Sequence, residues 1–216
     1  MTHSQLSQPA NLDDPAVRVL TSQRMDRAQQ VRDVALSMFV HEGFANVSLR
    51  HLGKRVGVHA GSLYNHVESK QALLFELIHE HLEGLVETVE QRTRKPVFVV
   101  EKLKVFVSIH LDFQLRQQEC AQLLSLELRS LDASHKAQIK PLLERYRTCL
   151  AQIITAGIRS GVFADQHVHT SVNSVLSLLS SVAFWFREGR QQPMKQLIKQ
   201  ITAMITGALC PPRQLS

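Results

Sequence analysis

The residues of this chain that could do chemistry gather in one basic stretch, residues 43–67. This stretch contains no carboxylate, and three of its side chains are cations: Arg50, Lys54 and Arg55. Residues 62–66 then bring hydroxyl, amide and imidazole groups close together. Cations and neutral hydrogen-bond donors without a competing acid favour contact with a polyanion. The segment therefore predicts a binding surface rather than a catalytic site.

Two short helices would have to position these groups. Ser48 is a good N-cap for the first, whose apolar residues fall on one face: Leu49, Leu52 and Val56. Gly57 follows, at the place where a helix commonly ends in a left-handed residue. A second helix over 60–66 buries Leu63 and exposes its polar residues. Two helices joined by a short turn containing glycine are typical of a DNA-reading helix-turn-helix, here at about residues 48–67.

Helical spacing of apolar residues continues over the rest of the chain. It predicts further helices at 23–41, 71–92, 97–117, 120–131, 136–160, 168–188 and 193–210, with no strand pattern. We expect an all-α fold of about nine helices. A polar N-terminal stretch, residues 1–22, is predicted to be a flexible tail. A three-helix DNA-binding domain would span 23–70, and a larger helical domain 71–210.

Composition narrows the functional class. The formal net charge of +6 fits a polyanionic partner, although many basic proteins bind no nucleic acid. The three cysteines are odd in number and far apart in the sequence, which favours a reducing, cytoplasmic location. No apolar run approaches the roughly 18 residues of a membrane span, so we expect no membrane partner.

Motifs of enzymes and metal sites are not found in the sequence. It has no HExxH, no glycine-rich phosphate loop, no nucleophile elbow and no cysteine pair with zinc spacing. His167 and His169 have only Asp165 nearby, which is too few ligands for a metal. We therefore predict neither enzyme activity, nor a metal site, nor a cofactor.

The last two predicted helices carry a broad apolar surface, which usually marks an interface. We expect them to form a twofold homodimer, in which two reading helices reach successive major grooves of a near-palindromic site. The predicted interface residues are Val175, Leu179, Val182, Phe186, Leu197, Ile201 and Ile205. The alternative is that both helices are simply central to the core.

The basic segment resembles the DNA-binding domain of the TetR/AcrR family of bacterial transcriptional regulators. The matching motifs are Phe39-x-x-x-Gly43-Phe44, Val47-Ser48-Leu49-Arg50-x-Leu52, Gly57-Val58, Gly61-Ser62-Leu63-Tyr64-x-His66 and Ser69-Lys70-x-x-Leu73. Two positions depart from the pattern: His59 stands where a Ser or Thr cap is usual, and Val67 where Phe is common.

Carried over by position, the resemblance implies phosphate contacts by Ser48 and Arg50 and a DNA-facing surface on the second helix. That surface comprises Ala60, Gly61, Ser62, Tyr64, Asn65 and His66, and Lys70 adds a contact at the next helix. Asn65 is the best candidate for base readout, because an amide pairs with adenine through two hydrogen bonds. Arg24, near the start of the first helix, is a further candidate for phosphate. Tyr64 could equally be a packed aromatic with only its hydroxyl at the surface.

The C-terminal domain is similar to a branch of the family with acyl-CoA-responsive members, through Tyr146, Gly157-x-x-x-Gly161-Val162-Phe163 and the stretch 176–186. The family resemblance implies a repressor whose effector enters the helical core and separates the reading heads. We expect the effector to be lipophilic, a fatty acyl or acyl-CoA compound, with an aromatic or drug-like compound as the alternative. The expected pocket residues are Leu103, Phe106, Phe113, Leu124, Tyr146 and Leu150. A helical protein-interaction module remains the rival function, but it leaves the basic segment unexplained.

Overall fold

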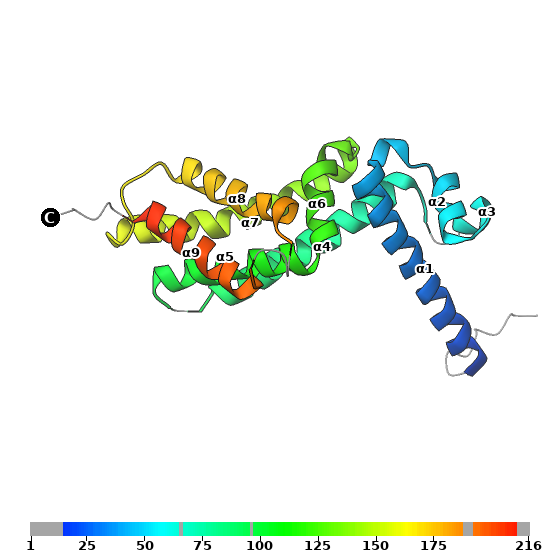
Figure 1. Cartoon of the computed structure of the whole chain (residues 1–216), viewed down its shortest axis with the longest axis horizontal. Helices are drawn as coiled ribbons and strands as arrows, with labels where there is room; N and C mark the ends of the chain where they lie inside the picture. Colours follow the sequence, from blue (N-terminus) through cyan, green and yellow to red (C-terminus); the bar gives the residue numbers. More distant parts are fainter. Residues whose placement is uncertain (1–14, 65–66, 96, 188–191, 211–216) are drawn as a thin grey trace, which may run out of the picture.

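The computed structural model describes residues 15–64, 67–95, 97–187 and 192–210, with only the backbone described for residues 15–26 and Ala60. Within these ranges every regular element is helical, which confirms the predicted all-α fold (Figure 1). The chain forms a small head of three helices at one end and a longer helical body at the other.

The head consists of α1 (Pro15–Glu42), the 3₁₀ turn η1 (Phe44–Asn46), α2 (Leu49–Val56) and α3 (Ala60–Leu63). Phe39 of α1 and Phe44 of η1 pack edge to face, with ring centroids 5.1 Å apart. Leu52 and Leu63 are fully buried in the same small core. Burial of these apolar side chains joins the two short helices to α1, since neither helix is long enough to be stable alone.

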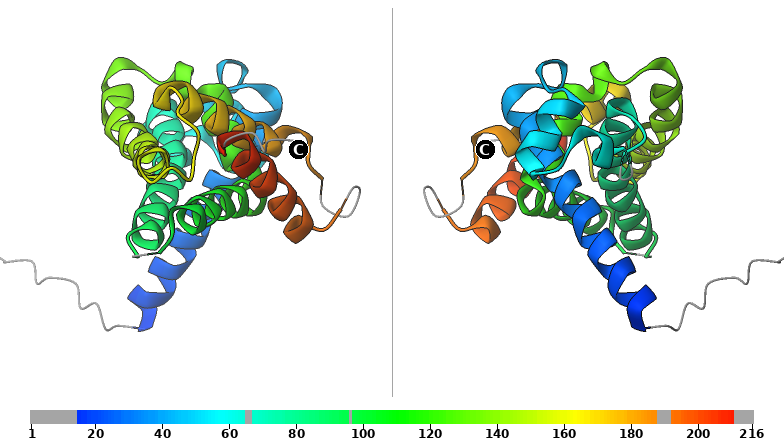
Figure 2. Two further views of the ribbon diagram at one scale, coloured as in Figure 1. Left: turned by 90° about the vertical axis from the view of Figure 1, so that its left-hand side faces the viewer. Right: turned by 90° about the vertical axis from the view of Figure 1, so that its right-hand side faces the viewer.

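The first helix begins earlier than predicted. It starts at Pro15 rather than near Gln23, so residues 15–22, assigned above to a tail, have helical backbone. The physical reason is local: proline suits the first position of a helix, and the following Ala, Val, Arg and Leu residues do not interrupt it. The first turns of α1 extend away from the other helices (Figure 2).

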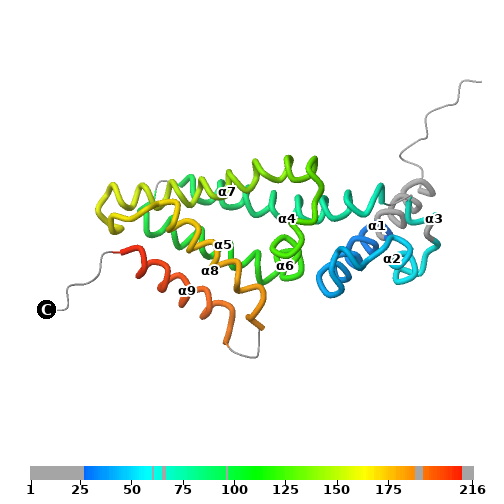
Figure 3. The backbone as a smooth tube through the Cα atoms, turned by 90° about the horizontal axis from the view of Figure 1, so that it is seen from above, coloured from blue at the N-terminus to red at the C-terminus, as the bar shows by residue number. Residues whose placement is uncertain are grey.

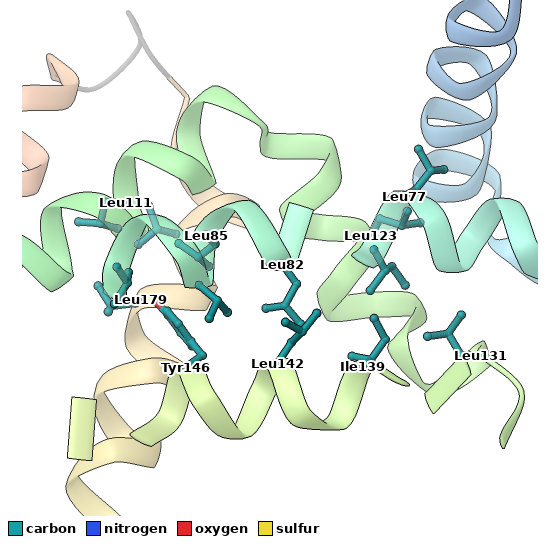
Figure 4. Packing of buried hydrophobic residues seen from close by; sticks show 14 of the residues in the cluster. Leu77, Leu82, Leu85, Leu111, Leu123, Leu131, Ile139, Leu142, Tyr146 and Leu179 are labelled. Carbon is teal, nitrogen blue, oxygen red and sulfur yellow. The ribbon is translucent and has the colours of Figure 1, made fainter. Parts of the chain in front are cut away.

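The body comprises α4 (Lys70–Thr93), α5 (Val99–Arg116), α6 (Gln118–Glu127), the 3₁₀ turn η2 (Leu128–Ser130), α7 (Ala133–Arg159), α8 (Val168–Trp185) and α9 (Met194–Leu209). Seen from above, α4 runs from the head into the body (Figure 3). It packs along α5 and α7, whereas α9 packs mainly on α5. Leu82 of α4 points toward Leu142 of α7, with Tyr146 one turn further along (Figure 4).

Helix α7 begins earlier in the sequence than predicted. Asp132 caps it by accepting a hydrogen bond from the His135 N–H at 2.9 Å, so it begins before the expected Lys136. Pro141 consequently lies inside the helix. Its ring is exposed, and the burial of the neighbouring Ile139 and Leu142 offsets the missing backbone hydrogen bond.

The seven residues predicted for the dimer interface all face inward. Each has at most 7% of its surface exposed, because it packs in the core of its own protomer. The apolar faces of α8 and α9 thus pack into the core of the protomer. The seven residues predicted for the interface are core residues instead. The outer surfaces of these helices still expose Phe184, Trp185 and Met204, the last to 63%.

Candidate nucleic-acid interface and effector cavity

The outer surface of α2 and α3 carries the predicted DNA-contacting groups. The hydroxyl of Ser48 accepts a hydrogen bond from the His51 N–H at 3.1 Å, which confirms it as the cap of α2. Ser48, Arg50, Gly61 and Ser62 are exposed. Gly57 has φ 76°, a left-handed conformation that a side chain would strain, and it turns the chain between the helices. The head therefore presents a compact polar surface at its outer end.

Tyr64 is 61% exposed, although it follows directly after buried Leu63. This excludes the alternative of a packed aromatic with only its hydroxyl at the surface. An exposed ring at the end of α3 is available for a partner. His59, which departs from the family pattern, is the N-cap residue of α3, and its side chain makes no capping hydrogen bond in the described part of the chain.

The cations of α2 are unpaired in the described part of the chain. Arg50, Lys54 and Arg55 are exposed, and none of them forms an ion pair with a described residue. By contrast, Arg32 of α1 donates to Glu76 at 2.8 Å and also pairs with Glu80, both on α4. The positive charge of α2 thus lies at the surface of the head, whereas Arg32 joins the head to the body.

Several predicted DNA contacts lie outside what the structure describes. Asn65 and His66 belong to the residues that are not described, and so do the side chains of Arg24 and Ala60. Their roles stay predictions. Val67, directly after this gap, is buried and donates its N–H to the Leu63 carbonyl at 3.0 Å.

Lys70 has an internal role that the sequence did not reveal. Its ammonium donates to the backbone carbonyls of Phe44 and Val47, both at 2.8 Å, and lies 4.1 Å from the centre of the Phe44 ring. Desolvation lowers the pKa of Lys70, although the charge of Glu127 opposes this. Lys70 fastens η1 to the start of α4, and its predicted DNA contact stays a prediction.

A carboxylate at the end of α6 holds the same turn from the other side. Oε1 of Glu127 accepts a hydrogen bond from the Phe44 N–H at 3.0 Å, and Oε2 accepts one from the Ser130 hydroxyl at 2.6 Å. Gln71 of α4 donates to the Ser130 carbonyl at 2.9 Å and accepts from the Asp132 N–H at 3.1 Å. We call the contacts of Glu127 and Lys70 with Phe44 the latch.

The body contains a cavity of about 680 Å³ between α4, α5, α6, α7 and α8. Two predicted pocket residues, Leu124 and Tyr146, line it. The other four, Leu103, Phe106, Phe113 and Leu150, do not. Leu103, Phe106 and Leu150 are fully buried in the core, and Phe113 packs near His81 with ring centroids 6.2 Å apart. These positions face neighbouring helices rather than open space.

The floor of the cavity is more polar than predicted. His110 forms a hydrogen bond through Nδ1 with the Tyr146 hydroxyl, and His81 forms one through Nδ1 with Gln117 at 2.7 Å. Burial, aided by nearby His81, lowers the pKa of His110 to about 3, so its imidazole is neutral. Burial also lowers the pKa of His81. The sequence did not predict these hydrogen bonds, because each histidine stands alone in an apolar helix and its partner lies on another part of the chain.

The mouth of the cavity has mixed charge. Exposed Lys140 and Glu144 lie there with half-buried Arg147, all on α7. Arg147 donates to the Asn173 side chain, which also contacts Nδ1 of His169 at 3.1 Å. On the other side the wall is formed by α6 and η2, through Leu124, Ser125 and Leu128. The cavity wall and Glu127 of the latch therefore belong to one segment.

Neither a metal centre nor a membrane span is found in the described ranges. They contain no group of three or more His, Cys, Asp or Glu side chains that could hold a metal ion. Instead, His167 caps α8, with Nδ1 3.0 Å from the Thr170 hydroxyl. None of the described helices is long and apolar enough to cross a membrane.

Comparison with known proteins gives two family matches. Residues 31–77 match the model of the bacterial regulatory proteins of the tetR family, and residues 98–209 match the tetracyclin repressor-like C-terminal domain. A relative is the fatty acid metabolism regulator protein of Bacillus subtilis, 26% identical over 64% of this chain and 72% of its own length. A similar solved structure is the ketosteroid transcriptional regulator KstR2 of Mycobacterium tuberculosis, with a TM-score of 0.80, 20% identity, and coverage of 86% of this chain and 96% of that one. Another is AibR in complex with isovaleryl coenzyme A and operator DNA, with a TM-score of 0.71, 18% identity, and coverage of 86% and 99%.

Proposed function

The chain belongs to the TetR family of bacterial transcriptional regulators, and we propose that it is a repressor released from its operator by a small lipophilic effector. Members of this family are DNA-binding regulators and not enzymes. The observation that carries the proposal is the exposed surface of α2 and α3. It combines the exposed cations Arg50, Lys54 and Arg55 with Ser62 and the 61% exposed ring of Tyr64. We place the protein in the cytoplasm, where such a regulator meets DNA.

The proposed operator is near-palindromic and bound by a homodimer. A short reading helix contacts only a few base pairs, so two copies related by a twofold axis are needed for specificity. The outer surfaces of α8 and α9 support this assembly, because Phe184, Trp185 and Met204 are exposed there to 41%, 47% and 63%. An apolar groove of about 480 Å³ beside Met204 extends this surface. These residues replace the inward-facing set expected from the sequence.

The effector would occupy the cavity between α4 and α8. Leu82, Leu85, Leu124 and Leu176 supply apolar walls for a lipophilic body, and Lys140 and Arg147 at the mouth suit an anionic group outside. The names of the relatives point the same way: one is a fatty acid metabolism regulator, and one structure holds isovaleryl coenzyme A. We propose a fatty acyl or acyl-CoA compound as the effector class.

Release follows from a shift in population between two arrangements of the head. An effector that binds the DNA-incompetent arrangement about a hundredfold more tightly supplies about 2.7 kcal/mol, enough for a hundredfold loss of operator affinity. The pathway we propose is short. The effector displaces α6 and η2 at Leu124 and Leu128, and the displacement reaches Phe44 through Glu127.

The experiment is a binding titration of the purified protein with labelled DNA from upstream of its own gene, by fluorescence anisotropy at several salt concentrations. We expect a protected palindromic site and an affinity that falls steeply with salt, because phosphate contacts release counterions. An acyl-CoA series of increasing chain length is then added to the complex. The proposal fails if no upstream site is bound above the level of unrelated DNA at moderate salt, with or without these compounds.

A further inference from the structure

The floor of the cavity holds two buried polar atoms without a hydrogen-bond partner among the described residues. They are Nε2 of His110 and Oε1 of Gln114. Their side chains are only 3% and 5% exposed, and both residues line the cavity. They lie one turn apart on α5, so they share a face of that helix. Buried polar atoms are almost always paired, and an unpaired one is costly.

The two atoms have complementary hydrogen-bonding character. Tyr146 keeps its proton because burial raises its pKa well above the usual value. Its hydroxyl can therefore donate to Nδ1 of His110, which leaves the proton of the neutral imidazole on Nε2. Nε2 is then a donor, whereas Oε1 of Gln114 is an acceptor. A single hydroxyl group has the hydrogen-bonding character that both atoms require, since its oxygen can accept from Nε2–H and its proton can be donated to Oε1.

The residues around these two atoms indicate the chemical character of the remainder of the ligand. Leu82, Leu85 and Leu124 make the walls apolar, so the body of the ligand must be lipophilic. The cations that line the cavity, Lys140 and Arg147, lie at its mouth. A carboxylate carried to the floor would lose its hydration without a counterion, which is strongly unfavourable. The buried group must accordingly be neutral.

We propose that the effector carries a neutral hydroxyl group on its buried end, held by His110 and Gln114, and that these two residues select hydroxylated over plain lipophilic compounds. This inference deepens the proposed effector function and rests on it for the identity of the cavity as a ligand site. It changes the expected ligand from a simple saturated chain to an oxygenated one. The rival explanation is a permanently bound water that satisfies the same two atoms.

Matched pairs of probes separate these explanations. Fatty acids from octanoic to hexadecanoic acid are compared with the corresponding ω-hydroxy acids, which share the carboxylate and chain and differ only at the end that would reach the floor. Affinities are measured directly with the full-length protein by calorimetry, without DNA. At the best chain length we expect the ω-hydroxy acid to bind about tenfold more tightly than its partner.

Gln114→Leu should abolish this preference, because leucine cannot accept the hydroxyl proton. The control is Gln152→Leu, the same change at an exposed position of α7 away from the cavity, which should keep the preference. Gln114→Met serves as a second apolar variant of similar length if Gln114→Leu does not fold. If a bound water satisfies the two atoms instead, the affinity of each ω-hydroxy acid relative to its matched fatty acid is the same in Gln114→Leu as in the natural protein.

Equal affinities within each pair, a preference retained in Gln114→Leu, or no binding of any hydroxylated acid would each overturn the inference. Failure of the proposed function looks different. If the ω-hydroxy acids bind in a Gln114-dependent way but never alter operator affinity, hydroxyl recognition stands and the role of the cavity in release is refuted.

Discussion

Glu127 offers the sharpest test of the proposed coupling between the cavity and DNA binding. The change is Glu127→Ala, which removes the acceptor for the Phe44 N–H and the partner of the Ser130 hydroxyl. The residue does not touch the DNA-binding surface, and it adjoins the cavity wall without being assigned to the cavity lining. We expect the variant to fold and to bind effector, but to transmit effector binding poorly to the head.

The magnitude follows from the geometry. A hydrogen bond from a backbone N–H to a carboxylate contributes about 1.5–3 kcal/mol when well formed, and partial burial reduces this to about 1–2 kcal/mol. If the effector releases the natural protein about a hundredfold, the coupling is about 2.7 kcal/mol. Removal of 1–2 kcal/mol, by the same estimate, leaves a release of only about three- to twentyfold.

The control is Glu119→Ala, the same change at the other end of α6. Glu119 also reaches the head, with its carboxylate 3.6 Å from Nδ1 of His41, but both side chains are exposed. Exposed ion pairs contribute little, so we expect its effector response to equal that of the natural protein. Two assays are made on both variants: operator titration with and without the best acyl-CoA, and amide hydrogen exchange at Phe44.

The exchange assay does not need an effector. Exchange of the Phe44 amide should accelerate about tenfold in Glu127→Ala, because its acceptor is lost, and should be unchanged in Glu119→Ala. If both variants show the natural exchange rate and the natural release ratio, Glu127 does not couple the cavity to the head, and the pathway through α6 is wrong.

Three further predictions concern other parts of the molecule. Tyr64→Ala should weaken operator binding about tenfold with an unchanged dimer in sedimentation, because its ring is exposed; loss of the dimer would contradict the modular assignment. Met204→Glu should raise the dimer dissociation constant at least about tenfold without changing the melting temperature of the isolated protomer, since Met204 is 63% exposed; an intact dimer would refute the α8–α9 interface. The pKa of His110 is lowered to about 3. The unfolded chain therefore takes up a proton below about pH 6.5 that the folded one does not, and the free energy of unfolding should fall by about 2–3 kcal/mol from pH 6.5 to 4.5. Urea titrations should show a smaller fall in His110→Gln, and equal falls would contradict the buried neutral imidazole.

The sequence predicted the helices well because each has a local cause. Ser48 caps α2, Gly57 ends it, and Leu52 and Leu63 mark the buried faces of α2 and α3. Each of these signals lies within a few residues of the feature it determines. The predicted start of α1 lies too far along the chain. The polar composition of the residues before it indicated a tail, although Pro15 is suited to a first helical turn.

The cavity could not be predicted with the same success. An inward-facing apolar residue has the same spacing whether it meets a neighbouring side chain, as Leu103 and Phe106 do, or open space, as Leu124 does. The same ambiguity placed buried residues such as Leu179 in the predicted dimer interface. Only the packing of several helices decides between these outcomes. The hydrogen bond between Glu127 and Phe44 joins residues 83 positions apart, so no local sequence pattern predicts it.

In the mechanism that we propose, the latch carries a change in the cavity to the head. Lys70, at the start of α4, binds the carbonyl of Phe44, while Glu127, at the end of α6, binds its N–H. Both helices also line the cavity, α4 through Leu82 and Leu85 and α6 through Leu124. An effector that separates the two helices therefore pulls on one residue from two sides. Because Phe44 packs on Phe39 in the head core, this pull would turn the head while both bonds hold, and a broken bond would no longer transmit it.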